Sequence, residues 1–194
     1  DPVRFLSNRS SGKMGYALAR AALRRGAEVT LVSGHSSIPP PKGVRFIPAD
    51  TAEDMQRAIR GELDVSSILI MAAAVADVMP AKKSSEKLEK SGLLFLQLSP
   101  TPDILKEAGT RGKRPFIVGF AAETGQAFEK ARKKLHEKNA DLIVFNDVTE
   151  PGSGFDFDTN KVTLIDRDAE NALPLLEKDE VADAILDRVI KLKA

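Results

Sequence analysis

The chain has 194 residues, of which 29% are charged, and a formal net charge of +1. This length is enough for one domain with its own core, and the balanced charge argues against a nucleic-acid interface, which needs a basic excess. With no cysteine there is no disulfide framework, thiolate metal site or cysteine nucleophile, and the separation of His35 and His136 disfavours a histidine metal cluster. The lack of cysteine suits a reducing, cytoplasmic setting, and no apolar run is long enough to span a membrane.

Helical and extended patterns alternate along most of the chain. Apolar residues recur at helical spacing in some segments, while others are short apolar runs bounded by Gly or Pro. The run at 66–75 is the most apolar and does not alternate, which is typical of a strand buried on both faces of a parallel sheet. We expect helices at 14–25, 51–60, 101–109, 125–138 and 178–190, and strands at 28–34, 44–47, 66–75, 93–98, 114–123 and 141–147.

Local signals mark several boundaries of these elements. Thr51, with Asp54 three residues later, approximates a capping box, and Thr101 followed by Pro102 predicts another helix start. The stretch "GFDFDTNKVTLID" predicts a late β-hairpin that turns at residues 158–160.

The alternation predicts one α/β domain over 1–194, with a doubly wound, Rossmann-like and mainly parallel sheet, helices on both faces and a late hairpin arm. Ligands of such sheets bind outside the carboxyl ends of the strands. The residues expected there are the loop around Asn8, Gly34, 74–77, 120–124 and 146–147.

The stretch "SNRSSGKMG", residues 7–15, enters the first predicted helix with hydroxyl, amide and glycine residues. Backbone N–H groups and hydroxyls at a helix N-terminus, where the dipole favours anions, predict a phosphate cradle. The stretch is neither a P-loop nor a G-x-G-x-x-G fingerprint, because Ser7 and Met14 stand where the P-loop needs other residues. An ordinary capped helix start is the alternative.

Charged residues in three other places have both a functional and a plain interpretation. Asp77 ends a buried strand, where it could contact a ribose, help to hold a divalent cation, or simply cap a turn. The polar stretch 79–92 is a candidate lid or a solvated loop. The lysines spaced by four at 130, 134 and 138 share one helix face, which either meets phosphates or only faces solvent.

Eight stretches in order, across essentially the whole chain, resemble the phosphopantothenoylcysteine synthetases of the bacterial type. They are "DPVRFLSNRSSGKMG", "VTLVSG", "AAAVAD", "SEKLEKSG", "TPDIL", "VGFAAET", "ARKKLHEKNADLIVFNDV" and "GFDFDTNKVTLI". The resemblance implies a ligase of coenzyme A biosynthesis. The carboxylate of 4′-phosphopantothenate attacks the α-phosphate of CTP, pyrophosphate leaves, and the amine of L-cysteine attacks the acyl-cytidylate to release CMP, with Mg²⁺ or another divalent cation accompanying the triphosphate.

The resemblance also assigns roles to residues that match the family's motifs. Asn8 would orient the reacting carbonyl of the acyl-cytidylate, and Lys87 would close over the nucleotide, with Lys90 as a less certain neighbour. Asp77 is the candidate metal ligand, and Asn146 is a further candidate for the crevice. The residues expected to bind the nucleotide are Ser10, Ser11, Gly12, Ala74, Asp77, Lys87, Asp103, Phe120, Lys134 and Lys138.

Members of this family are homodimers, and in many bacteria the synthetase follows a flavin-dependent decarboxylase, which alone uses FMN. Arg4 and the predicted hairpin at 154–165 are candidates for the dimer interface, against the alternative that the hairpin is a plain edge pair. The family also carries a strand before "DPVR" that ends in a glycine-rich loop. Because this sequence begins at Asp1, we expect it to be part of a longer protein.

Three rival functions remain open on the sequence. A nicotinamide-dependent oxidoreductase would need a dinucleotide fingerprint, which we do not find. ATP-using synthetases differ weakly in sequence from CTP-using ones. A nucleotide-binding regulatory module would bind CTP without releasing pyrophosphate.

Overall fold

The computed structural model describes residues 1–93, 95–125, 127–155 and 157–194. The helices are α1 Lys13–Arg24, α2 Ala52–Glu62, α3 Ile104–Gly109, α4 Phe128–Glu137 and α5 Lys178–Lys193, with a 3₁₀ turn at Lys90–Leu93. The strands are β1 Thr30–Ser33, β2 Arg45–Pro48, β3 Ile68–Met71, β4 Val78–Pro80, β5 Leu98–Pro100, β6 Phe116–Glu123, β7 Leu142–Asp147, β8 Thr159–Asn160, β9 Val162–Ile165, β10 Glu170–Ala172 and β11 Leu176–Glu177.

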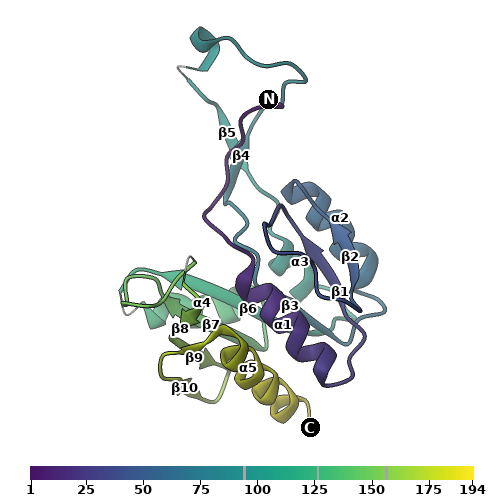
Figure 1. Cartoon of the computed structure of the whole chain (residues 1–194), viewed down its shortest axis with the longest axis vertical. Helices are drawn as coiled ribbons and strands as arrows, with labels where there is room; N and C mark the ends of the chain where they lie inside the picture. Colours follow the sequence, from purple (N-terminus) through teal and green to yellow (C-terminus); the bar gives the residue numbers. More distant parts are fainter. Residues whose placement is uncertain (94, 126, 156) are drawn as a thin grey trace.

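The main sheet has the order β10-β9-β7-β6-β3. Strands β3, β6 and β7 are parallel, whereas β9 and β10 join the β7 side antiparallel. Strand β7 is buried along almost its whole length, as its continuous apolar sequence predicts. Together with the helices in Figure 1, this confirms a mainly parallel α/β fold of the Rossmann type.

Helices cover both faces of the sheet, and each face has its own core. On one face, α1 and α5 lie side by side, and their apolar residues pack with Val118, Leu142 and Val144 of the sheet. On the other face, α2, α3 and α4 pack with Ile117, Ile143 and further apolar residues. The doubly wound arrangement predicted from the sequence is therefore present.

Strands β1 and β2 pair with each other in parallel and are separate from the main sheet. Between β1 and β3 lies a large, open cavity of about 2110 Å³, whose walls include both strands and apolar residues of α1, α2 and α5. Both strands are only half-buried, and each pairs with one other strand in the described part of the chain. We call the space between β1 and β3 the sheet slot. Its walls explain why the apolar run at 66–75 is not fully buried.

Two of the predicted helix starts differ in their outcome. Thr51 and Asp54 form the reciprocal capping box expected of them at the start of α2. At α3 the cap is Asp103, whose carboxylate accepts from the amide of Lys106, so the prediction that Thr101 caps this helix is wrong. The aspartate lies next to the first helical residue and satisfies an amide of the first turn there.

A long arm projects from the body of the molecule (Figure 1). The antiparallel pair β4–β5 forms its stem, and the N-terminal segment runs beside it. Arg4 donates to the carbonyl of Leu88 at 2.7 Å, and the amide of Leu88 donates to Asp1. The strand predicted at 93–98 is displaced to Leu98–Pro100, with residue 94 outside the described part.

The late hairpin is not where the sequence predicts it. Residues 159–160 form β8, which pairs with β11, and Val162–Ile165 form β9, which inserts beside β7. The hairpin is instead β9–β10, inside the main sheet, and the arm comes from the middle of the chain. Residues 159–160 are strand and not turn, because β8 pairs with β11, and β9 with β7 and β10, rather than with each other; residue 156 is outside the described part.

Candidate functional site

The loop before α1 meets the end of β3 beside the sheet slot. The side-chain amide of Asn8 donates to the carbonyl of Val75 at 3.3 Å, so "SNRSSG" contacts "AAAVAD" as the strand-end argument predicts. Ala74 is half-buried at this end, and Asp77 is exposed at the start of the arm. A doubly wound sheet binds ligands at such an edge, outside the carboxyl ends of its strands.

The glycine and serines of this loop have defined positions. Gly12 is the N-cap of α1 and has a φ of 76°, a left-handed conformation that favours glycine. A Cβ at this position would lie 3.2 Å from the hydroxyl of Ser36, which donates to the carbonyl of Ser11. Ser10 is exposed, while the hydroxyl of Ser11 donates to the carbonyl of Phe155 at 2.7 Å. The first-turn amides of α1 thus follow directly after a tightly folded loop. Amides at a helix start have no partner within the helix, so they are suited to bind an anion.

Lys134 of α4 reaches back to β6. Its ammonium donates to the carbonyl of Phe120 at 2.7 Å. Burial lowers the pKa of Lys134 below its usual value and nearby Lys138 lowers it further, whereas Glu123, Asp77 and Asp103 act in the opposite direction. Direct contacts thus join Lys134 to Phe120 and Lys138 to Asp103, so α3, α4 and β6 meet around a partly desolvated lysine.

Asp103 and Lys138 form an ion pair across this cluster. Burial acts to raise the pKa of Asp103, but the hydrogen bonds from Lys138 and from the amide of Lys106 outweigh it and lower the pKa. Asp103 therefore remains a carboxylate with defined partners at the start of α3. It fixes the ammonium of Lys138, whose side chain is 23% exposed, at the start of α3.

Lys87 lies elsewhere. It is exposed on the arm, next to Leu88, whose backbone is bound by Asp1 and Arg4. The arm extends away from the body, so this conformation does not bring Lys87 beside Asn8 within one chain (Figure 1). Lys90 lies further along the same exposed segment.

The polar residues at the end of β7 are occupied by structural contacts. Asn146 is buried and contacts the hydroxyl of Ser153 at 2.6 Å. Asp147 accepts from the hydroxyl and amide of Thr149 and from the amide of Gly125, and the hydroxyl of Thr149 is the main cause of its lowered pKa. Both residues shape the loops that follow β6 and β7.

Within the described residues, no group of three or more His, Asp or Glu side chains is arranged to hold a metal ion. Magnesium bound together with a nucleotide needs fewer ligands, because one or two carboxylates and the phosphates complete its shell. Asp77, exposed at the strand end, fits that role, whereas Asp103 is already paired with Lys138.

Sequence patterns did not indicate a second layer of residues around the first loop. Lys13 forms an ion pair with Asp158 at 2.7 Å, and Lys178 is buried at the start of α5, where it donates to the carbonyls of Gly154 and Phe157. The only available signal was a lysine at a helix start, a position that the helix dipole disfavours for a cation.

The chain is thus a Rossmann-like α/β domain in which the start of α1 and the ammonium of Lys134 lie at the carboxyl-end side of the parallel strands β3 and β6. Residues 1–192 match the model of the DNA/pantothenate metabolism flavoprotein C-terminal domain, and the chain belongs to this family. None of the described helices is both long and apolar enough to cross a membrane.

Two curated relatives are bifunctional coenzyme A biosynthesis proteins named CoaBC. The protein from Bacillus subtilis is 48% identical over 99% of this chain, and that from Escherichia coli K12 is 43% identical over 98%. In each case the chain spans 48% of the relative's length. A crystal structure of a CoaBC C-terminal domain is 41% identical, with a TM-score of 0.82, covering 97% of this chain and 86% of that one.

A more distant solved structure shares the fold. It is a Cab2 mutant in complex with phosphopantothenate-cysteine, 18% identical, with a TM-score of 0.76 over 97% of this chain and 80% of that one.

Proposed function

We propose that the domain is a phosphopantothenate–cysteine ligase that uses CTP. The observation that carries this proposal is the convergence of Asn8, the start of α1, Lys134 and Lys138 on one edge of a sheet, in a chain whose relatives are coenzyme A biosynthesis proteins. Cytoplasmic localisation is part of the same proposal.

The chemistry needs charge stabilisation more than a protein nucleophile. An oxygen of the 4′-phosphopantothenate carboxylate forms a bond to the α-phosphorus of CTP, and the bond to the pyrophosphate oxygen breaks. The amine of L-cysteine then forms a bond to the acyl carbon, loses a proton, and displaces CMP. Two anions meet in the first step, so oriented donors and cations dominate the site.

The crevice residues are suited to these demands. The first-turn amides of α1, with Ser10 and Ser11 near them, would bind phosphate oxygens, and Gly12 permits their close approach. Lys134 and Lys138 would neutralise charge that develops on the triphosphate. The amide of Asn8 would turn from the Val75 carbonyl to the acyl oxygen, and the cytosine would lie near Phe120 and Ala74.

Magnesium would be held by Asp77 and by phosphate oxygens of the substrate. When bound, it supplies a Lewis acid for the triphosphate. FMN has no role in this domain and would belong only to a decarboxylase domain of a bifunctional protein.

The sheet slot supports the expectation of a further strand. If the slot is counted as a strand position, the order becomes β2, β1, slot, β3, β6, β7, which matches the 3-2-1-4-5-6 order of doubly wound sheets with position one open. The order reverses between the slot and β3, next to Asn8 and Val75. We propose that an extended segment preceding Asp1 in the full protein fills this position and completes the crevice.

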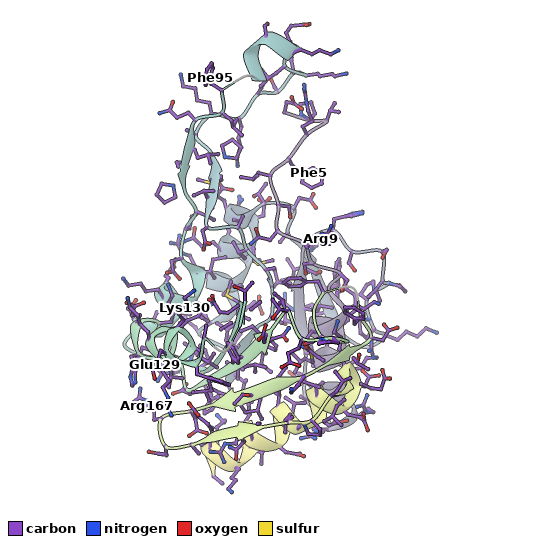
Figure 2. All side chains as sticks on the ribbon, turned by 90° about the vertical axis from the view of Figure 1, so that its left-hand side faces the viewer. Phe5, Arg9, Phe95, Glu129, Lys130 and Arg167 are labelled. Carbon is purple, nitrogen blue, oxygen red and sulfur yellow. The ribbon has the colours of Figure 1, made fainter. Side chains whose placement is uncertain are left out.

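The arm supports a homodimer. Several of its apolar side chains are exposed, among them Phe5 at 90% and Phe95 at 92%, and they project outward from it (Figure 2). Burying such a surface against a second copy would remove apolar area from water. It would also let the Lys87 of one subunit approach the crevice of the other. Arg4 lies on this arm, whereas the 154–165 segment lies in and beside the main sheet.

Pyrophosphate release tests the proposal. The chain would be assayed with 4′-phosphopantothenate and Mg²⁺, comparing CTP with ATP, with and without L-cysteine, and with the upstream segment restored. CTP-selective release that requires 4′-phosphopantothenate supports the ligase, and cysteine-dependent formation of CMP establishes the second step. Release that prefers ATP rejects the nucleotide assignment. CTP binding without release, even with the upstream segment, rejects the enzyme in favour of a regulatory nucleotide-binding module.

A further inference from the structure

Helices α1 and α5 run in the same direction, so their N-termini lie at the same end of the molecule. Three ion pairs show this: Arg20 with Asp179 at 2.7 Å, Arg24 with Asp183 at 2.8 Å and Arg25 with Asp187 at 2.8 Å. Residue numbers therefore increase in the same direction along both helices, which means that α1 and α5 are parallel. The start of α5 therefore lies on the side of the phosphate-binding loop that precedes α1.

Lys178, the first residue of α5, is only 7% exposed. Its ammonium donates to the carbonyl of Gly154 at 3.0 Å and to the carbonyl of Phe157, and its amide donates to the carbonyl of Asp158 at 2.9 Å. A buried cation at a helix N-terminus is disfavoured twice, by its loss of hydration and by the positive end of the helix dipole. Such a local conflict is expected where a side chain serves a function beyond packing.

The backbone that Lys178 holds belongs to residues 154–155 and 157–158, which we call the clamp; residue 156 is not part of it. The clamp contacts the phosphate-binding loop twice. The carbonyl of Phe155 accepts the hydroxyl proton of Ser11 at 2.7 Å, and the carboxylate of Asp158 pairs with Lys13 at 2.7 Å. Phe155 follows Gly154 and Asp158 follows Phe157, and the ammonium of Lys178 holds the carbonyls of Gly154 and Phe157. The contacted residues, Ser11 and Lys13, stand on either side of the N-cap of α1.

We propose that Lys178 is a positioning residue for the phosphate-binding loop: it holds the clamp in the conformation that orients Ser11 and Lys13 at the start of α1. It touches neither substrate nor reacting atoms. Its effect passes through the Phe155 carbonyl and the Asp158 carboxylate. Lys13, paired with an exposed carboxylate in the ligand-free chain, is thereby kept beside the first-turn amides where a phosphate would bind. The inference rests on the proposed function only in assigning phosphate to this loop.

Lys178→Met tests the proposal, because it retains the length and packing of the side chain but removes the ammonium donors. Lys191→Met, on an exposed position of the same helix, is the matched control. In the ligand-free chain we expect faster amide hydrogen exchange at residues 11–16 in Lys178→Met, with β7 unchanged and no effect in the control. Unchanged exchange at 11–16, or acceleration spread evenly through the core, would overturn the proposal.

Nucleotide binding gives a second measurement. We expect Lys178→Met to raise the Kd for CTP by about 10- to 100-fold, as expected when binding groups are displaced by a fraction of an ångström to an ångström. The effect should be non-additive with Ser11→Ala, since both changes act on one contact. Additive effects, or a change in thermal stability with an unaltered Kd, would show a merely structural role.

The two proposals fail in different ways. If the wild-type chain with the upstream segment restored binds neither CTP nor ATP while exchange at 11–16 still depends on Lys178, the ligase proposal fails and the positioning inference stands. If CTP binds equally well in the wild type and Lys178→Met, the inference fails alone. Should Lys178→Met not fold, Gly154→Ala strains the clamp instead, because Gly154 has a φ of 122°, and the same local exchange pattern is required of it.

Discussion

The ammonium of Lys134 lies 2.7 Å from the carbonyl oxygen of Phe120, so a helix lysine is drawn over the carboxyl-terminal part of a central strand. Burial disfavours its charge, as its lowered pKa indicates. The carboxylates of Glu123, Asp77 and Asp103 offset this only in part, because the pKa remains lowered. The triphosphate of the proposed substrate would add negative charge beside this ammonium and so favour its charged form.

Replacing Lys134 should separate stability from function. We expect Lys134→Met to reduce CTP-dependent turnover by about 10²–10³-fold, as for the loss of an oriented donor, with a melting temperature no lower than that of the wild type. The pKa of Lys134 is lower in the folded chain than in the unfolded chain. Between these two pKa values the unfolded chain binds more protons, so the free energy of unfolding of the wild type should rise with pH through that alkaline window.

The control for the loss of turnover is Lys130→Met, on an exposed lysine of α4, which should leave turnover unchanged. Full activity in Lys134→Met would remove this lysine from the site.

Asn8→Asp places a negative charge where the proposed site binds phosphates and turns a carboxylate toward the carbonyl of Val75. We expect pyrophosphate release to fall by about 10²–10³-fold, with an unchanged melting temperature because the side chain is exposed. Asn171→Asp, on the exposed edge strand β10, makes the same chemical change away from the crevice and should have no effect. Wild-type pyrophosphate release in both Asn8→Asp and Asn171→Asp would contradict the role of Asn8.

Acid stability should depend on the pair Arg114 and Asp141 at the beginnings of β6 and β7. Burial acts to raise the pKa of Asp141, but hydrogen bonds from Arg114 and from the amide of Ile117 outweigh it and lower the pKa below the unfolded value of about 3.9. The stabilisation is therefore present above about pH 4 and is lost as the pH falls through the folded pKa.

The corresponding measurement is urea unfolding from about pH 6 to about pH 3. Asp141→Asn should lower the free energy of unfolding at about pH 6, and this free energy should then fall less steeply than in the wild type as the pH is lowered. Asp187→Asn, at a 71% exposed position, should retain the wild-type pH profile. A wild-type slope in Asp141→Asn would assign acid sensitivity to other carboxylates.

Much of the fold follows from local patterns. Each of these patterns depends on residues that are close in sequence. Examples are the capping box at Thr51 and the apolar run of β7. The prediction of a hairpin turning at 158–160 was wrong because β8 pairs with β11 and β9 with β7, and long-range pairing overrides a local turn signal. Thr101 failed as a cap because a better acceptor, Asp103, stood next to the helix.

The grouping of several candidate residues at one edge of the sheet was predictable for a different reason. Carboxyl ends of parallel strands meet at one edge, so the loop around Asn8 and residues from "AAAVAD" and "VGFAAET" could be placed together without contacts being known, whereas Asp103 was placed by the family resemblance. The buried Lys178 was not predictable. Its contacts depend on the parallel packing of α1 and α5, and a lysine at a helix start otherwise suggests solvent exposure.

Oligomeric state should depend on the apolar arm. We expect Phe95→Ser combined with Phe5→Ser to shift the chain from dimer to monomer in sedimentation velocity, with the melting temperature of the body retained. Val65→Ser changes an 81% exposed apolar residue outside the arm and is the control that should stay dimeric. A wild-type chain that sediments as a monomer at all concentrations would reject the dimer, and a dimeric double variant would reject the arm as its interface.

Adding a strand upstream of Asp1 should complete the sheet. We expect an extension of about five apolar residues, joined to Asp1 by a glycine-rich linker long enough to reach from the slot to the arm, to raise the melting temperature by more than about 4 °C and to protect amides of β1 and β3 from hydrogen exchange. The gain arises because the strand would pair with both open edges and cover the half-buried walls of the slot. The same extension with a proline at its centre cannot donate to the ladder there and should stabilise less. If both extensions leave the melting temperature and the exchange of β1 and β3 unchanged, the slot is not a strand position, and the crevice beside Asn8 must be completed in another way.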